Sequence, residues 1–311
     1  MKRALVTGAA GFIGAHLTAR LLERGVEVVG IDNLSWGHAE KVESLPGMRL
    51  IRGDVRKLPE LGKELGAFTH VFHLAALISA YDSLNKPDDY FDTNVAGLMR
   101  LLELCQGSEK PRVVFASTSG IYGNSEKPLK SEDDLPRPTT VYAATKLMGE
   151  QLLAMYRSRF GFDDVSLRFF NVFGPGQSTT HPYANVTCRF AHAAANGLGV
   201  QLFGDGKQTR DFVYVDDVVD AMLLVATNPT RHSLYNVGTG QTASIAELLR
   251  MAQRLAGQNI SVEQMPPWPN DIREIRADMS RLSSELGFRA KVSMEEGLAR
   301  TIGWFKRTPQ A

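Results

Sequence analysis

The chain has 311 residues and a formal net charge of +1, with 43% hydrophobic and 22% charged residues. This composition is typical of a globular protein with a sizeable core, and the near-zero charge argues against a nucleic-acid or membrane-surface partner. The two cysteines, Cys105 and Cys188, argue against a disulfide framework, and no stretch approaches the roughly 20 apolar residues that span a bilayer, so we expect a cytoplasmic protein.

The first segment, MKRALVTGAAGFIGAHL, has a basic start and an apolar run, as a secretory signal would. Gly8, Gly11 and Gly14 interrupt that run, and Asp32 stands where a signal should already have ended. We therefore assign the segment to the mature fold, as a strand that leads into a helix. Glycines at this turn let backbone N–H groups approach a pyrophosphate, and the helix N-terminus adds partial positive charge. The alternative is a glycine-rich turn kept for steric reasons.

An acidic residue ends the second predicted strand, EVVGID. Asp32 lies about 20 residues after the start of the glycine turn, where a carboxylate can bind both hydroxyls of an adenosine ribose. The same charge would repel a 2′-phosphate, so the pattern favours NAD over NADP. Asp54, in the sequence GDV after the third predicted strand, could contact the adenine amino group or could be a surface carboxylate.

Short apolar runs alternate with amphipathic stretches through the first half of the chain. ALVT, EVVGID, MRLI, HVFHLA, RVVFAS and VSLRFF are each typical of a strand, and most could be covered on both faces. This order predicts an α/β fold with a doubly wound parallel sheet (Rossmann) and right-handed crossovers. We expect an NAD-binding domain over residues 1–172, to which the chain returns around 210–238, and a smaller mixed α/β substrate domain over 173–311.

The pattern changes after Asn171. NVFGPGQSTTHPYANV is expected to form a loop, followed by a helix around Phe190 to Asn196 and a strand at VQLF. DFVYVDDVVDAMLLVAT predicts a strand that feeds a helix, and LYNVG predicts another strand. The C-terminal part is predicted to be mostly helical, at SIAELLRMAQRLAG, SRLSSELG and MEEGLARTIGWFKR.

Tyr142 and Lys146 are four residues apart in VYAATKLMGEQLL, which places both on one helix face. A phenol has a pKa of about 10, and a nearby ammonium lowers it, which would make Tyr142 a base near neutral pH. The alternative is an ordinary pair of helix residues. Ser117 and Thr118 end the strand VVFAST just upstream, where a hydroxyl can meet a ligand at the carboxyl end of a sheet. They could equally cap a turn.

Six motifs occur in a fixed order: TGAAGFIG, HLAA, FASTSGIYG, YAATK, LRFFNVFGPGQ and GDGKQTRDFVYVDDVV. With them the chain resembles, over essentially its whole length, the extended short-chain dehydrogenases/reductases of the nucleotide-sugar epimerase and dehydratase group. The resemblance implies that Thr118, Tyr142 and Lys146 are the catalytic hydroxyl, the base and the cofactor-positioning lysine. It also implies NAD as cofactor, in a site lined by Gly8, Gly11, Phe12, Ile13, Gly14, Asp32, Asn33, Asp54, Val55, Leu74, Ala75, Ala76, Asn94, Ser117, Tyr142, Lys146 and Phe169.

Members of this group share a first step, in which hydride passes from sugar C4 to NAD while the tyrosine takes the O4 proton. Dehydratases carry an acidic pair after the catalytic threonine, and related decarboxylases keep one glutamate there. This chain has Ser119 and Gly120, neither of which can act as a general acid or base at pH 7. A carboxylate from elsewhere, such as Asp82, could still take that role.

The resemblance therefore implies 4-epimerisation of a nucleotide-diphosphate sugar, such as UDP-glucose or UDP-galactose or an N-acetyl or uronic derivative, through a transient 4-keto sugar. NAD is regenerated in each cycle and should stay bound. The alternatives are a 4-ketosugar reductase, a sugar-nucleotide dehydratase and a dinucleotide-sensing regulator. The regulator is disfavoured because Tyr142 and Lys146 are both present.

By the same resemblance, Thr118 and a second group of residues would bind the sugar nucleotide. Asn171 and Arg210 would contact the diphosphate, since a guanidinium binds phosphate oxygens in a fork geometry. Phe203 and the adjacent VQLF backbone would bind the base. In isolation, each of these residues could instead have a structural role or face solvent.

One departure from the family pattern concerns the same group. Trp268 stands where epimerases of this kind often carry an arginine, three residues before Asp271. Arg273 could supply the missing charge, and Asp271 would bind a ribose or order its loop. Ile275 falls where the family has a side chain that limits the bulk allowed on the sugar, and its intermediate size leaves the sugar undecided.

The remaining histidines and cysteines show no metal-ligand spacing, and we expect no metal. His73 is expected to be a packed or hydrogen-bonded histidine, and the cysteines to be inert thiols. The apolar faces NVAGLMRLLELC and YAATKLMGEQLLAMY could be ordinary core. In the family the equivalent helices pair across a two-fold axis, which implies a homodimer.

Overall fold

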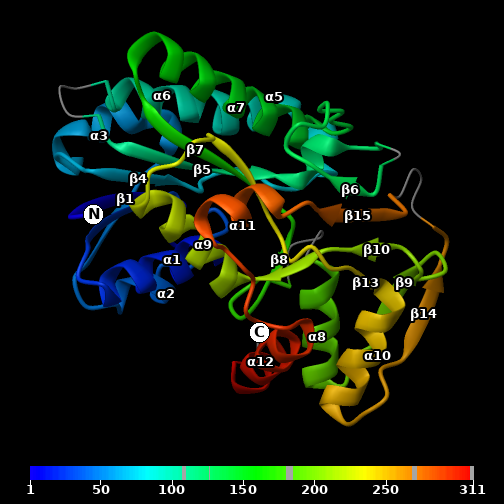
Figure 1. Ribbon diagram of the computed structural model, residues 1–311. Helices are drawn as coiled ribbons and strands as arrows, with labels where there is room; N and C mark the ends of the chain where they lie inside the picture. Colours follow the sequence, from blue (N-terminus) through cyan, green and yellow to red (C-terminus); the bar gives the residue numbers. More distant parts are fainter. Residues whose placement is uncertain (107–109, 126, 180–184, 268–271, 309–311) are drawn as a thin grey trace. The chain divides into compact units, whose positions relative to one another are not determined.

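The computed structural model describes residues 1–106, 110–125, 127–179, 185–267 and 272–308 (Figure 1). The chain divides into two compact units, each assembled from separate segments. The first unit consists of Met1–Gly123, Leu135–Arg168 and Val219–Tyr235, and the second of Asn124–Asp134, Phe169–Val218 and Asn236–Ala311. The assignment of NAD binding to residues 1–172 and of substrate binding to residues 173–311 stays a prediction.

A seven-stranded sheet forms the centre of the first unit, in the order β12-β7-β5-β4-β1-β2-β3. The strands are β1 (Arg3–Thr7), β2 (Glu27–Asp32), β3 (Met48–Arg52), β4 (His70–His73), β5 (Arg112–Thr118), β7 (Asp163–Phe169) and β12 (Leu234–Val237). β1 pairs in parallel with β2 and β4, β2 with β3, and β4 with β5. The N–H groups of Ser166 and Phe170 donate to the carbonyls of Ser233 and Val237, which advance by the same step, so β12 also runs parallel to β7. The predicted doubly wound parallel sheet is confirmed.

Helices cover both faces of this sheet because its strands are apolar on both sides: β1 and β2 bury all but their first residues. Figure 1 shows α3, α6 and α7 over one face and α1 and α9 over the other. The helical elements are α1 (Phe12–Glu23), α2 (Glu40–Glu43), a 3₁₀ turn (Val55–Lys57), α3 (Leu58–Leu65), α4 (Asp82–Asn85), α5 (Pro87–Tyr90), a π-helical turn (Phe91–Ala96), α6 (Gly97–Leu104), a second 3₁₀ turn (Ser119–Tyr122), α7 (Val141–Phe160) and α9 (Val215–Thr227).

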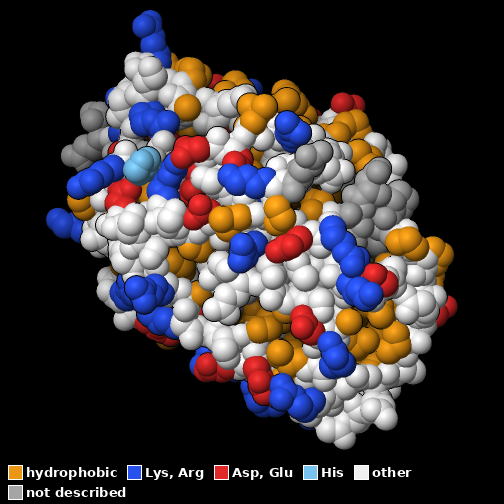
Figure 2. Space-filling model, turned by 45° about the vertical axis from the view of Figure 1, so that its right-hand side comes forward, with side chains coloured by type: hydrophobic (Ala, Val, Ile, Leu, Met, Phe, Trp, Pro, Cys, Tyr) orange, Lys and Arg blue, Asp and Glu red, His pale blue; other side chains and the backbone are white. Residues whose placement is uncertain are grey.

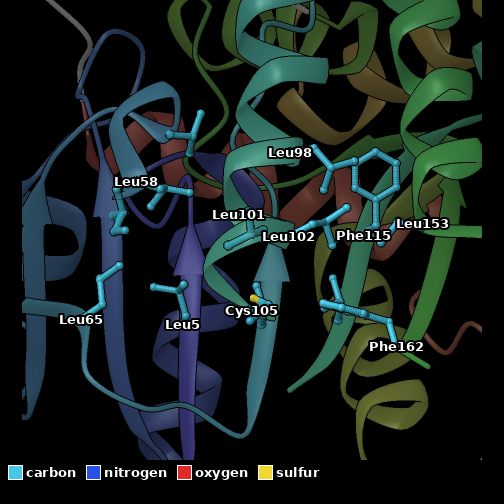
Figure 3. Packing of buried hydrophobic residues seen from close by; sticks show 14 of the residues in the cluster. Leu5, Leu58, Leu65, Leu98, Leu101, Leu102, Cys105, Phe115, Leu153 and Phe162 are labelled. Atoms are coloured by element: carbon cyan, nitrogen blue, oxygen red, sulfur yellow. The ribbon is translucent and has the colours of Figure 1, made fainter. Parts of the chain in front are cut away.

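One large buried cluster of the first unit lies between the sheet and the helices α3, α6 and α7. Leu98 and Leu101 of α6 gather with Phe115 of β5 and Leu153 of α7 in one buried cluster (Figure 3). Gly149 allows α7 to approach the sheet closely, since a Cβ there would lie 2.6 Å from the ring of Phe115. This packing fixes the face of α7 that carries Tyr142 and Lys146.

The second unit contains a four-stranded sheet in the order β13-β10-β15-β6 and two parallel strand pairs, β8 with β11 and β9 with β14. Its elements are β6 (Leu129–Lys130), β8 (Asn171–Phe173), α8 (Val186–Asn196), β9 (Val200–Phe203), β10 (Thr209–Arg210), β11 (Phe212–Tyr214), β13 (Ala243–Ser244), α10 (Ile245–Ala256), β14 (Val262–Met265), β15 (Glu274–Ala277), α11 (Ser280–Leu286) and α12 (Met294–Arg307). The segment beginning NVF was predicted to be a loop, and this prediction is wrong for its first three residues. They form β8, because they pair in parallel with β11.

Within the described part of the chain, no helix combines the length and the apolar character needed to cross a bilayer. The cytoplasmic location stays a prediction.

A buried ion pair at the far end of α7 gives a testable pH dependence of stability. Asp164 Oδ2 accepts a hydrogen bond from Arg157 Nη1 at 2.7 Å, and burial raises the pKa of Asp164 to about 6. Because the folded pKa lies above the ordinary value of 3.8, the folded state favours the neutral carboxyl of Asp164. The stability that this protonated form contributes is present at low pH and is lost as the pH rises through about 6. We expect the free energy of unfolding, relative to an Asp164→Asn variant, to fall by about 3 kcal/mol from acidic to neutral pH. Urea unfolding of both proteins across this range measures the difference, and a constant difference contradicts the assignment.

Candidate active site

The glycine turn between β1 and α1 is shaped by close backbone contacts. Gly8 adopts a φ of +72°, its N–H donates to the carbonyl of Ile31 at 2.7 Å, and a Cβ there would lie 2.8 Å from the backbone N of Ala75. A Cβ on Gly14 would collide with the carbonyl oxygen of Gly8. The N-cap residue of α1 is Gly11, so no side chain caps the first-turn N–H groups. The predicted residues Phe12 and Ile13 form that turn, which suits an anionic pyrophosphate.

Asp32 ends β2 beside this turn, as predicted, and is 8% exposed. Its Oδ2 accepts a hydrogen bond from the N–H of Ala10 at 3.0 Å, and its Oδ1 accepts one from the N–H of Leu34 at 2.8 Å. These bonds fix the carboxylate in place, and each oxygen retains capacity to accept from a hydroxyl. Three features fit a bound NAD. They are the uncapped N-terminus of α1, the space beside Gly8 and Gly14 that a Cβ would fill, and the fixed carboxylate of Asp32.

We expect Asp32→Ala to weaken the affinity for NAD by roughly 10- to 100-fold, because hydrogen bonds to a charged acceptor are lost. The NAD released by denaturing extensively dialysed protein measures this loss. Asp163→Ala serves as the control, since Asp163 is a carboxylate at the start of β7 with a side chain 60% exposed, whereas Asp32 ends β2. NAD content equal to that of the wild type would contradict the ribose assignment.

Asn33 and Asp54 lie next to each other after β2 and β3. The Nδ2 of Asn33 donates to Asp54 Oδ2 at 3.1 Å, and the guanidinium of Arg56 donates to both carboxylate oxygens at 2.9 and 2.7 Å. The side-chain hydrogen bond from Arg56 holds the pKa of Asp54 well below its usual range. Asp54 also caps the turn that buries Val55. The proposed adenine contact must therefore form beside an existing ion pair, and it stays a prediction.

The segment after β4, which carries Leu74, Ala75 and Ala76, is tied to β1. Thr7 accepts from the N–H of Leu74 through its carbonyl at 3.1 Å and from the N–H of Ala75 through Oγ1 at 3.3 Å. The same Oγ1 lies 2.8 Å from His73 Nδ1, and burial lowers the pKa of His73 to about 3. His73 is thus a neutral, packed histidine, as predicted.

Asn94 sits in the π-helical turn and is buried. Its Oδ1 accepts from the N–H of Leu77 at 2.9 Å, while its Nδ2 donates to the Leu77 carbonyl and to Thr145 Oγ1, both at 3.0 Å. The residue therefore joins the segment after β4 to α7. These contacts give Asn94 a structural role, and its predicted contribution to the NAD site stays a prediction.

The three predicted catalytic side chains come together at the carboxyl end of β5. Thr118 is the last residue of the strand; its Oγ1 accepts from the N–H of Gly120 at 3.1 Å, and its side chain is hydrogen bonded to that of Tyr142. Tyr142 lies in the first turn of α7, which Thr140 caps. Lys146 Nζ donates to the carbonyl of Ala116 at 2.9 Å.

The electrostatics of this group differ from the prediction. Burial raises the pKa of Tyr142 to about 12, although the hydrogen bond with Thr118 opposes the change, and burial lowers the pKa of Lys146 to about 7. The expectation that Lys146 lowers the tyrosine pKa is wrong for the chain alone, because desolvation disfavours the charged form of each group.

Apart from Thr118, which belongs to the first unit, the predicted sugar-nucleotide residues with described positions lie in the second unit. Asn171 Nδ2 donates to the Asp211 carbonyl at 3.1 Å, and Arg210 Nη1 donates to the carbonyls of Thr209 and Ile272 at 2.8 and 2.6 Å. Arg273 forms an exposed ion pair with Asp205, at 3.0 Å.

The remaining predicted residues have varied positions. Phe169 ends β7, Phe203 ends β9 and Ile275 is buried in β15. Asp271 and Trp268 lie outside the described residues.

Asp211 is a buried carboxylate that sequence reasoning missed. It accepts from Thr239 through N–H and hydroxyl at 2.8 and 2.7 Å, from the N–H of Gly240 at 2.9 Å and from the N–H of Ala277 at 3.1 Å. Burial raises its pKa. Asp211 thereby fixes the backbone next to Arg210, and its only sequence signal is an acid placed directly before the apolar run FVYV. Among the described side chains, no group of three or more His, Cys, Asp or Glu residues could hold a metal ion.

Comparisons with known proteins agree with this geometry. A family model described as the NAD-dependent epimerase/dehydratase family matches residues 4–238. The UDP-glucose 4-epimerase of Mycolicibacterium smegmatis is 38% identical over 314 residues, covering 99% of this chain and 100% of the relative. The structure of UDP-glucose 4-epimerase from Thermotoga maritima with UDP-glucose aligns with a TM-score of 0.93 at 33% identity, covering 99% of this chain and 100% of that one. The Thermus thermophilus UDP-glucose 4-epimerase in complex with NAD gives a TM-score of 0.90 at 38% identity, covering 98% of this chain and 99% of that one.

Proposed function

Because this chain belongs to the NAD-dependent epimerase/dehydratase family, we propose that it is an NAD-dependent epimerase that inverts C4 of a UDP-hexose. The sugar is glucose or galactose, or an N-acetyl or uronic derivative. One observation carries the choice of reaction: Thr118 is hydrogen bonded to Tyr142, and the two residues that follow Thr118 in the sequence are Ser119 and Gly120. Elimination or decarboxylation needs a further acid or base beside the sugar, and neither residue titrates near neutral pH.

In this mechanism Tyr142 removes the O4 proton as C4 is oxidised and returns it after the 4-keto sugar has turned over. Bound NAD supplies the hydride acceptor and donor at C4. Thr118, itself fixed by the N–H of Gly120, holds the tyrosine oxygen in place. Lys146 lies one helical turn further along α7, held by the carbonyl of Ala116, and would position the cofactor. The glycine turn and Asp32 would hold the dinucleotide.

The proposal assigns the sugar nucleotide to residues of the second unit. Arg210 is held by two backbone carbonyls, which reduces the side-chain entropy lost when it binds a phosphate. The Arg273–Asp205 ion pair is exposed, so it contributes little to stability. Arg273 can therefore leave Asp205 and bind a phosphate instead. Asn171 and Phe203 complete the proposed set, with Asp271 kept as a prediction from sequence.

The test is incubation of the purified protein with UDP-glucose, UDP-galactose, UDP-N-acetylglucosamine and UDP-glucuronate in turn. Proton NMR should show an equilibrium mixture of C4 epimers for at least one of them, without added NADH. Formation of a 4-keto-6-deoxy sugar or loss of CO₂ would overturn the assignment of Ser119 and Gly120. Oxidation of a sugar to the 4-keto form only with added NAD or NADP, with an equal amount of NADH or NADPH accumulating, would indicate a reductase working in reverse. Bound NAD without turnover of any sugar would indicate a regulator.

We also propose that the chain forms a homodimer through the outer faces of α6 and α7. Met99 on α6 is exposed, as are Met148 and Met155 on α7, which lie seven residues apart on one side of that helix. Figure 2 shows hydrophobic side chains at the surface in the upper part of the view, where α5 to α7 lie in Figure 1. Exposed apolar area of this kind is typical of an interaction surface.

Met148→Glu should convert the dimer to a monomer, because a carboxylate would be buried at the interface without a partner. Sedimentation equilibrium measures the mass. Leu198→Glu is the control, since Leu198 is also an exposed apolar residue, in the second unit, and its change should leave the mass unaltered. A wild-type protein that sediments as a monomer would contradict the proposal.

A further inference from the structure

We infer that the buried Glu150–Arg168 ion pair is a positioning device for the reaction, which sets α7 against the end of β5 so that Tyr142 meets Thr118. The inference rests on the proposed function and adds to it two residues, neither of which touches the reacting atoms. Its basis is a set of contacts that joins α7, β5, β7 and the turn after Thr118.

The pair is almost inaccessible to solvent, with side chains 3% exposed for Arg168 and 10% for Glu150. Arg168 Nε and Nη2 donate to Glu150 Oε1 and Oε2 at 2.9 and 2.7 Å, which is a bidentate geometry. Ser117 Oγ donates to the same Oε1 at 2.6 Å. The guanidinium of Arg168 also lies 4.8 Å from the ring centre of Tyr122, in the 3₁₀ turn that follows Thr118.

Three consecutive residues of β5 therefore each hold one residue of α7. The carbonyl of Ala116 accepts from Lys146, the hydroxyl of Ser117 donates to Glu150, and the side chain of Thr118 bonds to Tyr142.

The three helix residues are spaced by four, so they share one face of α7. Two of the attachments use the reacting groups themselves, which must change charge or partners during turnover. The attachment through Glu150 is the one that stays fixed.

Stability alone does not account for a charge pair in this place. The desolvation of two buried charges offsets most of their attraction, and apolar residues of similar volume are often as stable. The pair adds a directional contact. A bidentate hydrogen bond fixes the position of α7 along its axis and its rotation about that axis, while an apolar contact lets the helix shift along its axis. The close approach at Gly149, where a Cβ would meet the ring of Phe115, leaves little room for α7 to compensate for a shift.

The chain offers a matched control on the same two elements. Arg157 on α7 and Asp164 on β7 form another ion pair with a buried carboxylate, at 2.7 Å, toward the opposite end of the helix from Tyr142. Loss of this pair also removes a link between α7 and β7. It leaves untouched the attachments to Ala116, Ser117 and Thr118.

The experiment compares Glu150→Gln with Asp164→Asn in the full-length protein. For Glu150→Gln we expect kcat for C4 inversion to fall by about 10- to 100-fold, with KM for the sugar nucleotide changed by less than about threefold. For Asp164→Asn we expect kcat within about twofold of the wild type, whatever the change in melting temperature. Wild-type kcat in folded Glu150→Gln, or equal losses in the two variants, would overturn the inference.

A measurement without turnover separates this inference from the proposed function. In protein labelled with ¹³C at tyrosine Cζ, the Tyr142 signal, identified by its loss in Tyr142→Phe, should move in Glu150→Gln and stay in place in Asp164→Asn. If the wild type inverts no sugar, the proposed function fails, while this signal still decides whether Glu150 positions Tyr142. Should Glu150→Gln not fold, Arg168→Lys replaces it with the same expected results, because it keeps the charge and loses the bidentate geometry.

Discussion

Replacing Tyr142 with phenylalanine should lower kcat for C4 inversion by about 10²- to 10⁴-fold, the range that general acid–base catalysis supplies. The substitution removes one oxygen atom, which is the atom bonded to Thr118 and the only part of the side chain that can take the O4 proton. The ring stays in place, so the fold and the affinity for the sugar nucleotide should change little. Epimer formation followed by NMR measures kcat, and the nucleotide extracted from the protein verifies that NAD is retained.

Tyr156→Phe is the matched control for this experiment. Tyr156 lies on the same helix, is buried, and packs against Phe160 and Phe162 away from Thr118. It should keep wild-type kcat. A Tyr142→Phe variant with more than about a tenth of wild-type kcat would mean that another group takes the proton.

Gly14→Ala should abolish the retention of NAD during purification and lower the free energy of unfolding by at least 1–3 kcal/mol, as overpacking typically does. The added methyl group would collide with the carbonyl oxygen of Gly8, which is backbone and cannot rotate away. Either α1 or the turn must move, and both form the surface on which a pyrophosphate would lie. The 260 nm absorbance of the purified protein and its urea unfolding curve measure the two effects.

Gly303→Ala provides the comparison, because Gly303 lies inside α12 and a Cβ there would meet only the end of the Arg307 side chain, at 3.5 Å. Alanine is the better helix former, so this variant should bind NAD normally and gain about 0.5–1 kcal/mol of stability. If Gly14→Ala also retains NAD, the glycine turn is not the pyrophosphate site.

The features that sequence alone could predict are those set by neighbouring residues. The strand–turn–helix around Gly8 and the position of Asp32 follow from local spacing, and the near-continuous apolar runs identify the strands of the sheet. The three catalytic candidates also meet as predicted, because Thr118 ends a strand and Tyr142 and Lys146 share the helix that packs on it.

What could not be predicted depends on contacts between distant segments. Burial raises the pKa of Tyr142 and lowers that of Lys146, which the spacing of the two residues does not reveal. Asn171 starts a strand only because Phe212–Tyr214 lies beside it. In GEQLL, Glu150 has the pattern of a surface residue. The one signal of its role was a charge within the apolar strand VSLRFF, at Arg168.

The place of β12 at one end of the seven-stranded sheet has a consequence for biosynthesis. Its residues, Leu234–Val237, are made long after β7 (Asp163–Phe169), beside which they lie in the sheet. Until they leave the ribosome, one edge of β7 presents unpaired N–H and C=O groups, a template on which strands of other nascent chains can add. Cotranslational folding of the first unit therefore stays incomplete for some 65 residues of further elongation (Phe169 to Leu234). During that interval, chaperones that shield strand edges should matter most for the yield of protein.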